Sequence, residues 1–466
     1  MSMEKKSAIA AERYDVVVAG GGPAGTMAAI ASARSGAKTL LIERYGFLGG
    51  MITNALVGPM QSFHSRDEQV VTGIAQEVVD RLVAIGGSPG HVKDMIGFAA
   101  SVTPVDAEKL KYVLQEMCVE SGVHLQLHTV VTGARTDAGR IRSLELFNKS
   151  GAFEAEAPVY IDCTGDGDVM WMAGVPFDKG REKDGLAQPM TMMFRMGGVD
   201  LAEVRAFIKA NSQQFVLADD WESCSHVGVS GFFSLVRNAR SSGELTIERD
   251  RVLFFELPAK GEVSVNMTRV IRYDATDGAA LSAAEVLGRR QVMEVVRFLN
   301  RHIPGFGAAY LIHCGTQIGV RESRRLRGQY TLTADDVLSG KTFGDAIARG
   351  SYPIDIHSPD SGELDATEIK RAAAYDIPYR CLLNDRVRNL IVAGRCISAT
   401  HEAIASARVS PTAMAIGHAA GAAAALAASL GVDPGGVDVS RIQRLIVEQG
   451  GNLRIGTEAG LRGEKG

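Results

Sequence analysis

The chain opens on a short run of apolar residues that has the pattern of a buried strand. Residues 14–19 (Tyr-Asp-Val-Val-Val-Ala) carry the β-branched character of a strand that is covered on both faces. A glycine-rich turn at 20–25, an alanine-rich helix over 26–35 and a second strand over 39–42 follow. Strand, turn, helix and strand within about 30 residues predict a βαβ unit.

Two amphipathic helices are predicted next. Residues 72–85 place apolar side chains on one side of a helix, and a second helix begins at Asp106, a good N-cap. From 123 to 162 the pattern becomes strand-like, with turn signals between the strands.

The middle third of the chain has a different pattern, in which short mixed segments alternate with polar loops. One long helix is predicted from Ser282, whose spacing to Glu285 is that of a capping box. The chain then returns to a buried strand at 390–393 and to a helix of small residues over 411–430. This order indicates a substrate lobe inserted into a nucleotide-binding domain.

The predicted fold class is therefore α/β, a Rossmann-like nucleotide-binding domain with an inserted α+β substrate domain. The expected boundaries are 14–170 for the first part of the nucleotide domain, 171–379 for the inserted substrate or cap domain and 380–450 for the second part. A length of 466 residues is about three times that of a typical single domain, which fits two or more lobes.

Composition and charge exclude several function classes. The net charge of −4 argues against a general nucleic-acid binder, and the six scattered cysteines lack zinc or iron–sulfur spacing, so no metal is expected. Residues 1–13 lack the apolar segment of a signal peptide, and the longest apolar run, 419–428, is too short to span a bilayer. We expect a cytoplasmic protein whose partner is a small molecule, with no nucleic acid and no membrane span; assembly into a homo-oligomer stays open.

The glycine turn predicts a dinucleotide site. Gly20 permits a tight turn, Gly22 lets a pyrophosphate approach the main chain, and Gly25 allows close helix–strand packing. The helix N-terminus attracts phosphates, and Glu43 at the end of the second strand is placed to accept hydrogen bonds from ribose hydroxyls. The competing interpretation is a glycine-rich turn beside an ordinary surface glutamate. The motif alone does not distinguish NAD from FAD.

Two later segments favour FAD. Residues 161–168 place a Thr-Gly turn directly after a strand, and residues 390–395 place another strand that ends in glycine before a helix. A cofactor as long as FAD must be held at both ends, which accounts for the late return to the nucleotide domain. No second strand–GxGxxG–helix unit is present to predict an NAD(P)H domain.

These segments resemble the FAD-dependent oxidoreductase family, in the glutathione-reductase-like (GR2) class of flavoproteins related to fumarate reductase and succinate dehydrogenase. The resemblance covers most of the chain. It is carried by 20–25 with Glu43-Arg44, 47–53 (FLGGMIT), 162–168 (DCTGDGD), 319–325 (GVRESRR), 352–357 (YPIDIH), 393–403 (AGRCISATHEA) and 408–412 (RVSPT).

The resemblance implies FAD bound without a covalent link, since the chain has no histidine matching the family's attachment motif. It also implies that the helix opened by Pro411 points toward flavin O2. The chain departs from its respiratory relatives at Gly394-Arg395, where they carry an acidic residue. The residues it assigns to cofactor binding are Gly20, Gly22, Pro23, Ala24, Gly25, Glu43, Arg44, Gly49, Gly50, Met51, Thr53, Val131, Thr164, Gly165, Gly394, Arg395, Pro411, Thr412 and Ala413.

Two side chains lead the candidates for chemistry. His401 lies in a polar loop before the flavin-facing helix, and histidine is the side chain most often used as a general acid or base, so it is the first candidate for that role. The alternative for His401 is a hydrogen bond to a loop carbonyl. Arg408 is the best anion clamp, because a guanidinium binds a carboxylate through two hydrogen bonds. Its alternative is a structural salt bridge.

Further basic side chains form a second rank. Arg321, clustered with Arg324 and Arg325 around Glu322, either contacts flavin or substrate or belongs to an ion-pair network between domains. His357 and His313 are further catalytic candidates, for which a structural role is the competing interpretation. The methionines of 190–196 are expected in a core or a pocket wall.

We therefore expect an FAD-dependent oxidoreductase, a dehydrogenase or reductase that moves hydride between flavin N5 and a small polar or carboxylated metabolite. One alternative is a flavin monooxygenase, disfavoured because Gly394-Arg395-Cys396 does not match that class. The other is a flavoprotein subunit that passes electrons to a separate chain. The electron acceptor, the substrate and the direction of transfer stay undefined at this point.

Overall fold

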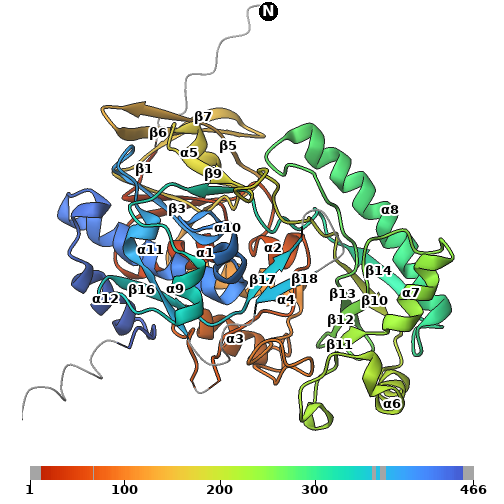
Figure 1. Cartoon of the computed structure of the whole chain (residues 1–466). Coiled ribbons are helices and arrows are strands. Elements are labelled where there is room, and N and C mark those ends of the chain that lie inside the picture. Colours follow the sequence, from red (N-terminus) through yellow and green to blue (C-terminus); the bar gives the residue numbers. More distant parts are fainter. Residues whose placement is uncertain (1–11, 67, 359–363, 368–373, 455–466) are drawn as a thin grey trace, which may run out of the picture.

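The computed structural model describes residues 12–66, 68–358, 364–367 and 374–454. Figure 1 shows two lobes side by side, a larger one built from both ends of the sequence and a smaller one built from its middle. The expectation that no signal peptide is present concerns mainly residues 1–11, which lie outside the described residues.

A five-stranded parallel sheet forms the centre of the larger lobe. Strand β2 pairs with β3 on one side and β8 on the other, which confirms the predicted βαβ unit. The late strand β20 joins the same sheet next to β8. In sheet order the strands are β20 (Leu390–Val392), β8 (Val159–Asp162), β2 (Val16–Ala19), β3 (Thr39–Ile42) and β4 (His124–Gln126).

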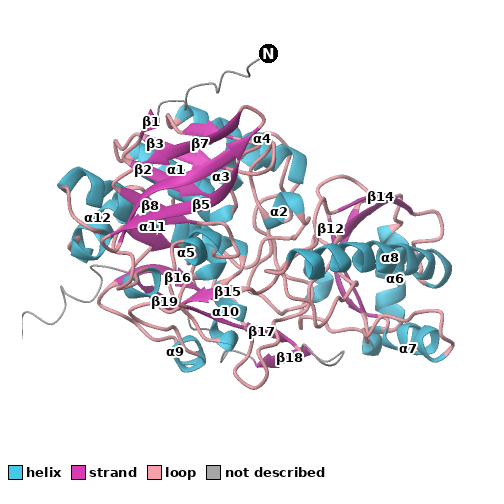
Figure 2. Ribbon diagram, turned by 90° about the horizontal axis from the view of Figure 1, so that it is seen from above, coloured by secondary structure: helices cyan, strands magenta, loops and turns pink. Residues whose placement is uncertain are grey.

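Two layers cover the central sheet, one on each face. Val16 belongs to a core formed with helices α1 (Pro23–Arg34) and α11 (Ser410–Leu430), whereas Val17 packs against a second sheet. Figure 2, seen from above, shows these layers one behind another. The second sheet has the order β1 (Glu12–Arg13), β7 (Gly151–Glu156), β6 (Arg140–Asn148) and β5 (Val130–Asp137).

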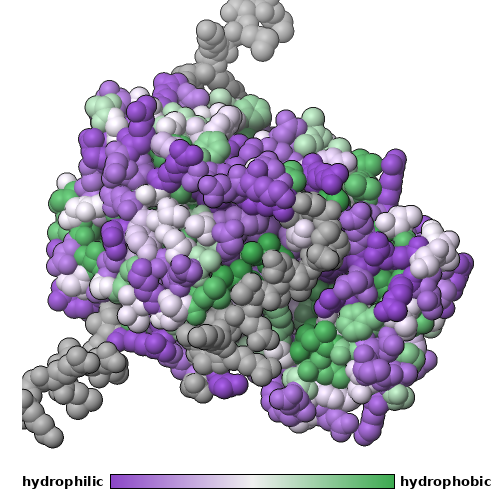
Figure 3. Space-filling view, in the orientation of Figure 1, coloured by the Kyte–Doolittle hydropathy of each residue, from purple (hydrophilic) through white to green (hydrophobic). Residues whose placement is uncertain are grey.

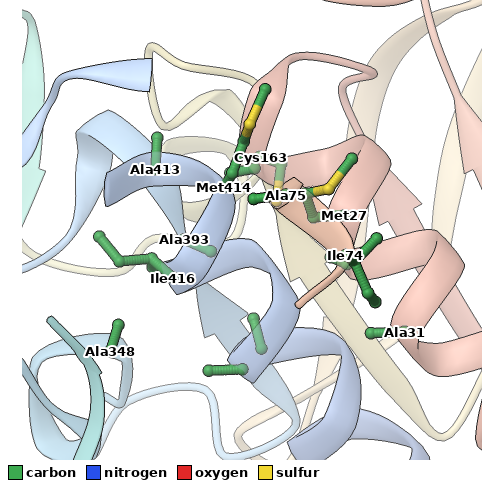
Figure 4. Close-up of a cluster of buried hydrophobic side chains, with 14 of the residues drawn as sticks. Met27, Ala31, Ile74, Ala75, Cys163, Ala348, Ala393, Ala413, Met414 and Ile416 are labelled. Carbon is green, nitrogen blue, oxygen red and sulfur yellow. The ribbon is translucent and has the colours of Figure 1, made fainter. Parts of the chain in front are cut away.

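Helices α1 and α11 lie parallel and very close together. A Cβ atom at Gly417 would lie 2.0 Å from the Ala24 carbonyl oxygen, and one at Gly421 would lie 2.1 Å from that of Ala28. Glycine is therefore required for this backbone approach. Figure 4 shows Met414 and Ile416 of α11 in a cluster with side chains of α1 and α3. The parallel packing points both helix N-termini toward the carboxyl ends of β2 and β20.

Short helices and strand pairs complete the larger lobe. The two amphipathic helices predicted from the sequence are present, and the Asp106 carboxylate caps the second by accepting the N–H groups of Glu108 and Lys109. The helices are α2 (Met51–Asn54), α3 (Ile74–Ala84), α4 (Ala107–Glu120), α5 (Asp168–Met172), α9 (Ala334–Ser339), α10 (His401–Ala407) and α12 (Val439–Glu448). The strand pairs are β9 (Phe177–Lys179) with β15 (Arg324–Leu326), β16 (Ala346–Gly350) with β19 (Tyr375–Pro378), and β17 (Ile354–His357) with β18 (Leu364–Thr367).

The smaller lobe is a five-stranded antiparallel sheet with helices on one face. This α+β lobe confirms the predicted fold class. Its sheet order is β11 (Gly228–Gly231), β12 (Val252–Glu256), β13 (Val263–Val265), β10 (Phe194–Gly197) and β14 (Tyr310–Cys314). Its helices are α6 (Leu201–Ala210), α7 (Phe233–Ser241) and α8 (Gly278–His302).

The long helix α8 begins one turn earlier than its predicted start. Asp277, not Ser282, is the N-cap, and its carboxylate accepts the N–H of Ala280. Glu285 does not reach back to cap the helix but accepts the N–H of Ile318 at 2.7 Å. The capping-box prediction is wrong, because a better cap stands upstream and a strand-end loop takes the glutamate.

Each lobe has its own hydrophobic core. The smaller lobe's core draws on Met95 and on buried residues between Met190 and Val320, including Met190, Met192 and Met196, as predicted for a core. Met193 packs instead with Leu56 and Ala107 in a small separate cluster. Buried residues from Leu332 onward belong to the larger lobe's core. The independent core of the inserted lobe is thus smaller than the range 171–379.

Among the described residues, α11 is a helix long and apolar enough to cross a membrane by length and composition alone. Of its most apolar window, 72% is buried inside the protein. The core helix of a globular protein passes the same test, and the contact with α1 accounts for the apolar character of α11.

His418 makes the stability of this core depend on pH. It is buried on α11 and bonds Gln449 Oε1 through Nε2 at 2.7 Å. Burial lowers the pKa of His418 to about 4, the bond to Gln449 opposes this, and Arg34 lowers it further. The unfolded chain binds the proton near pH 6.5. Protonation therefore favours unfolding, and stability falls as the pH drops from about 6.5 toward 4.

We expect the His418→Gln variant to lose less stability in acid than the wild type. Between pH 7 and pH 5 the difference in unfolding free energy should be about 2 kcal/mol, from about 1.4 kcal/mol for each pKa unit. Urea unfolding of both proteins at the two pH values measures it. If both proteins lost the same unfolding free energy between pH 7 and pH 5, the imidazole at this position could not be buried in its neutral form.

Candidate functional site

One cavity runs from the carboxyl ends of the central strands to the face of the smaller lobe. It encloses about 340 Å³, within the range of small-molecule sites. Residues from both lobes line it, including Gly20 and Gly394 at one end and Leu253 and Phe255 at the other. The early and late glycine turns, far apart in the sequence, thus border the same space.

The early glycine turn has the geometry that its motif predicts. Gly20 has a φ of +96°, a conformation that favours glycine. A Cβ atom at Gly25 would lie 1.8 Å from the Gly20 carbonyl oxygen, so the helix packs closely against the strand end. At Gly22 the nearest atom to such a Cβ is the Gly50 Cα, at 3.7 Å, and both glycines line the cavity. A ligand can therefore approach the main chain at Gly22.

Two helix N-termini face this part of the cavity. Gly22 and Pro23 at the start of α1, and Ser410 and Ala413 at the start of α11, line it. Among the described residues no side chain caps either helix, and neither first turn contains an acidic residue. Their N–H groups and the positive ends of two helix dipoles are thus available to a negatively charged ligand.

Glu43 lines the cavity at the end of β3 and shapes the glycine turn. Its Oε2 accepts the N–H of Gly21 at 2.7 Å, and its Oε1 accepts that of Tyr45 at 3.0 Å. Burial raises the pKa of Glu43, while these backbone hydrogen bonds and Arg44 oppose the rise. The carboxylate oxygens keep further lone pairs for hydroxyl donors.

The late turn supplies the opposite wall. Gly394 and Arg395 line the cavity, and the Arg395 guanidinium is held by Asp166 Oδ1 and Ser323 Oγ, both at 2.9 Å. Two buried polar atoms near this region, Asn54 Oδ1 and Thr412 Oγ1, have no hydrogen-bond partner within the described part of the chain. Such atoms are satisfied by a ligand or by water.

Most of the residues predicted to bind the cofactor line the cavity, and the others do not. Lining the cavity are Gly20, Gly22, Pro23, Ala24, Glu43, Arg44, Gly50, Met51, Thr164, Gly165, Gly394, Arg395 and Ala413. Outside its lining are Gly25, Gly49, Thr53, Val131, Pro411 and Thr412. The Thr53 hydroxyl donates to the Leu48 carbonyl, so its visible role is to brace the glycine loop.

Three guanidinium groups that line the cavity lie close enough for their charges to interact, and we call Arg249, Arg321 and Arg408 the arginine group. Their hydrogen bonds go to neutral acceptors. Arg321 Nη1 donates to the Pro189 carbonyl at 2.6 Å and to Thr191 Oγ1 at 2.5 Å. Arg408 Nη2 donates to the carbonyl of Asp355 at 3.2 Å, and Arg249 Nη2 to that of Asn266 at 2.9 Å. Among the described residues, Arg408 Nη1 and Arg249 Nε have no partner.

The charges of the arginine group are not balanced by carboxylates. Burial lowers the pKa of Arg321 well below its usual value, and the charges of Arg408 and Arg249 lower it further. Burial opposes ionisation of Asp355, but His357 and Arg408 outweigh it and hold the pKa of this carboxyl far below its usual range. Asp250 also lines the cavity and acts on Arg249, but it is already paired with Arg251. A buried excess of positive charge therefore remains, and it favours an anionic ligand.

His357 is the histidine that lines this part of the cavity. Its Nε2 lies 3.3 Å from Asp355 Oδ2, and its Nδ1 has no partner among the described residues. Burial lowers the pKa of His357 to about 3, although Asp355 opposes the shift. The imidazole is therefore neutral near pH 7 and holds a free nitrogen at the cavity wall.

His401 is held elsewhere. It is buried at the first position of α10, outside the cavity lining, with Nδ1 2.8 Å from Glu322 Oε2. Glu322 also pairs with Arg325, and Arg324 Nη1 lies 2.9 Å from Asp168 Oδ1. The structure therefore places His401, Arg324 and Arg325 in ion-pair networks, while Arg321, Arg408 and His357 meet at the cavity. His313 also lies outside the lining.

Sequence reasoning missed three residues of this region. Asp355 stands two positions before His357 on β17, a spacing that places both side chains on one face of a strand and could have been noticed. Arg249 comes from a charged stretch before β12 in the other lobe, and nothing local marks it. Tyr352 lies beside Asp355, with its hydroxyl 3.4 Å from Oδ2.

Comparison with known proteins identifies the chain at the family level. The family model described as "FAD dependent oxidoreductase" matches residues 15–446, nearly the whole chain. This match agrees with the glycine turns, the paired helix N-termini and Glu43.

Solved structures of similar fold include proteins with different named activities. A geranylgeranyl bacteriochlorophyll reductase-like protein from Thermoplasma acidophilum is 14% identical, with 94% of this chain and 84% of that chain covered, at a TM-score of 0.50. A variant of the flavin-dependent brominase Bmp2 is 13% identical, with 94% and 85% covered, at the same TM-score. The anhydrotetracycline hydroxylase OxyS from Streptomyces rimosus is 13% identical, with 94% and 66% covered, at 0.43. At these identities the likeness is one of fold, and none of the three is a fumarate reductase or succinate dehydrogenase flavoprotein.

Proposed function

The chain belongs to the FAD-dependent oxidoreductase family, and we propose that it oxidises or reduces a small carboxylated substrate that the arginine group holds beside FAD. When bound, FAD supplies the hydride acceptor or donor. The single observation that carries the substrate side is the excess of positive charge formed by Arg249, Arg321 and Arg408 around Asp355 in a cavity shared with the cofactor residues.

The residues present fit FAD. The uncapped N-termini of α1 and α11 suit phosphate groups and other negatively charged oxygens, and Gly22 leaves the main chain accessible. Glu43 suits ribose hydroxyls. The Asn54 side chain lines the cavity, and its unpartnered Oδ1 adds a polar atom that a cofactor would satisfy.

On the substrate side, the chain's own residues divide the work. Arg408 and Arg321 bind and orient the carboxylate, since a guanidinium offers parallel donors to both oxygens. His357 accepts or returns a proton at Nδ1, with Asp355 orienting the ring through Nε2. A bound anion would offset the arginine charges and so raise the pKa of His357 toward the working pH.

Anaerobic mixing of the FAD-loaded enzyme with a library of carboxylates tests this proposal. The expected result is loss of the flavin absorbance when a carboxylate is added to the oxidised enzyme, or its return when a carboxylate is added to the enzyme reduced beforehand with dithionite. The matched alcohols or amides without the carboxylate should leave the absorbance unchanged. A library in which neutral compounds reduce the flavin as fast as carboxylates would overturn the proposal.

An oxygen-using flavoenzyme is the second candidate. A flavin-dependent brominase has this fold, which supports this candidate over a kinship with fumarate reductases. Such an enzyme needs an external reductant, so substrate alone would not bleach the flavin under nitrogen. Oxygen uptake in step with a hydroxylated or halogenated product, in the presence of NADH or NADPH, would establish it in place of the dehydrogenase.

A further inference from the structure

The end of the cavity farthest from the glycine turns carries an apolar surface beside polar residues such as Ser230 and Arg251. Five side chains form this surface, and we call them the apolar wall: Ile96, Phe98, Val216, Leu253 and Phe255. Figure 3 shows hydrophobic surface on the smaller lobe over β11, beside the hollow between the lobes. Binding of an anion would explain the arginine group, but it would not explain why the same cavity also has an apolar wall.

Strand β12 presents the wall by its alternation. Phe254 is fully buried in the core of the smaller lobe, while its neighbours Leu253 and Phe255 line the cavity on the opposite face. On the paired strand β11, Gly228 stands opposite Phe255 and Ser230 opposite Leu253. A Cβ at Gly228 would lie 3.3 Å from the Phe255 ring, so the glycine leaves that ring in place without crowding it.

A loop from the larger lobe completes the wall. The Asp94 carboxylate accepts the backbone N–H groups of Ile96, Phe98 and Ala99, which fixes the loop and orients its side chains. Burial raises the pKa of Asp94, and these backbone bonds oppose the rise. Asp94 also lines the cavity, but its carboxylate is occupied with its own loop, and Ile96 and Phe98 give the loop its apolar surface.

The apolar wall and the arginine group are continuous. The Phe98 ring meets the Tyr352 ring edge-on, with 5.6 Å between centroids and an interplanar angle of 69°. The Tyr352 hydroxyl lies 3.4 Å from Asp355 Oδ2, and Asp355 contacts Arg408 through its carbonyl. One ligand can therefore touch both surfaces.

We infer that the substrate is an amphiphilic carboxylate, with its anionic group at the arginine group and an aromatic or aliphatic body against the apolar wall. This inference rests on the proposed function and specifies its substrate class. A small polar acid would leave the apolar wall in contact with water, and a neutral hydrocarbon would leave the guanidiniums without a counter-charge. Only a ligand with both parts satisfies both surfaces.

The test measures binding to the FAD-loaded enzyme under nitrogen, by the change in flavin absorbance or fluorescence. Four probes separate the contributions: phenylacetate, acetate, succinate and 2-phenylethanol. Phenylacetate should bind at least tenfold more tightly than acetate or succinate, because it buries a ring, and at least tenfold more tightly than 2-phenylethanol, because it carries the charge.

Matched variants assign the two halves of the ligand. Phe255→Ala and Leu253→Ala should each lower the ratio of phenylacetate affinity to acetate affinity at least fivefold. The control Phe147→Ala, at an exposed phenylalanine of the larger lobe, should leave this ratio unchanged. Arg249→Met should weaken the binding of all three carboxylates at least tenfold and leave the binding of 2-phenylethanol unchanged. Arg251→Met should have a smaller effect, because Asp250 already pairs with Arg251.

The outcomes separate this inference from the proposed function. Tighter binding of succinate than of phenylacetate, equal binding of acid and alcohol, absence of binding by all four probes, or wild-type selectivity in both wall variants would each overturn it. If the probes bind in the expected pattern but no carboxylate reduces or reoxidises the flavin, the ligand class is supported and the proposed reaction is refuted. If only small polar acids bleach the flavin, the proposed reaction is supported and the amphiphilic ligand class is refuted.

Discussion

Replacing Arg408 by methionine is expected to lower kcat/KM for a carboxylate substrate by about 100- to 1000-fold. Truncating one partner of a buried charge pair costs about 2–5 kcal/mol, and each 1.36 kcal/mol is a factor of ten in rate. In the free enzyme Arg408 donates to one carbonyl, and its Nη1 has no partner among the described residues, so most of its interaction energy stays available for the ligand. Steady-state kinetics with the substrate found in the library measures the loss.

The same substitution should leave the fold unharmed. Burial lowers the pKa of Arg408, while Asp355 partly compensates, so removing the charge relieves a desolvation cost. We expect FAD content to be unchanged and the melting temperature of Arg408→Met to equal or exceed that of the wild type. Arg408→Lys should recover only part of the activity, because it restores the charge without the planar fork. A kcat/KM within threefold of the wild type would show that Arg408 does not hold the substrate.

The sequence was sufficient for those parts of the fold that local chemistry specifies. The βαβ unit, the positive φ of Gly20 and the Asp106 cap follow from patterns within a few residues. The start of α8 was missed because two adjacent caps compete, and the choice of Asp277 leaves Glu285 to bond Ile318 in a loop about thirty residues away. Such pairings depend on tertiary packing, which no local pattern encodes.

The candidate site divides in the same way. The cofactor residues cluster in glycine turns, and the position of such a turn between a strand and a helix predicts its function from the sequence. His401 was the first candidate for the chemistry because it precedes α11, yet Glu322 from a distant segment takes its Nδ1 and holds it outside the cavity lining. Arg249 was missed for the converse reason, since it reaches the cavity from the other lobe. Which basic side chains meet is decided by the docking of the lobes.

Replacing Gly417 by alanine should disrupt the cofactor site by forcing apart the two helices that border it. The added methyl would lie 2.0 Å from the Ala24 carbonyl oxygen, far inside van der Waals contact, and both partners are helix backbone that cannot rotate away. Helix α11 must therefore separate from α1, which moves Ala413 away from Gly22 at the cavity. Overpacking of a core costs about 1–3 kcal/mol and occasionally more, and we expect at least the upper end of that range.

Two readouts and a matched substitution make this expectation specific. FAD content after purification should fall at least tenfold in Gly417→Ala, and urea unfolding should report the lost stability. Gly278→Ala adds the same methyl in the first turn of α8, where no atom lies within 4 Å, and should change stability by less than about 1 kcal/mol. Full FAD content in Gly417→Ala would mean that the two glycine turns bind the cofactor without needing the close contact of α1 and α11, and that the shared cavity tolerates their separation.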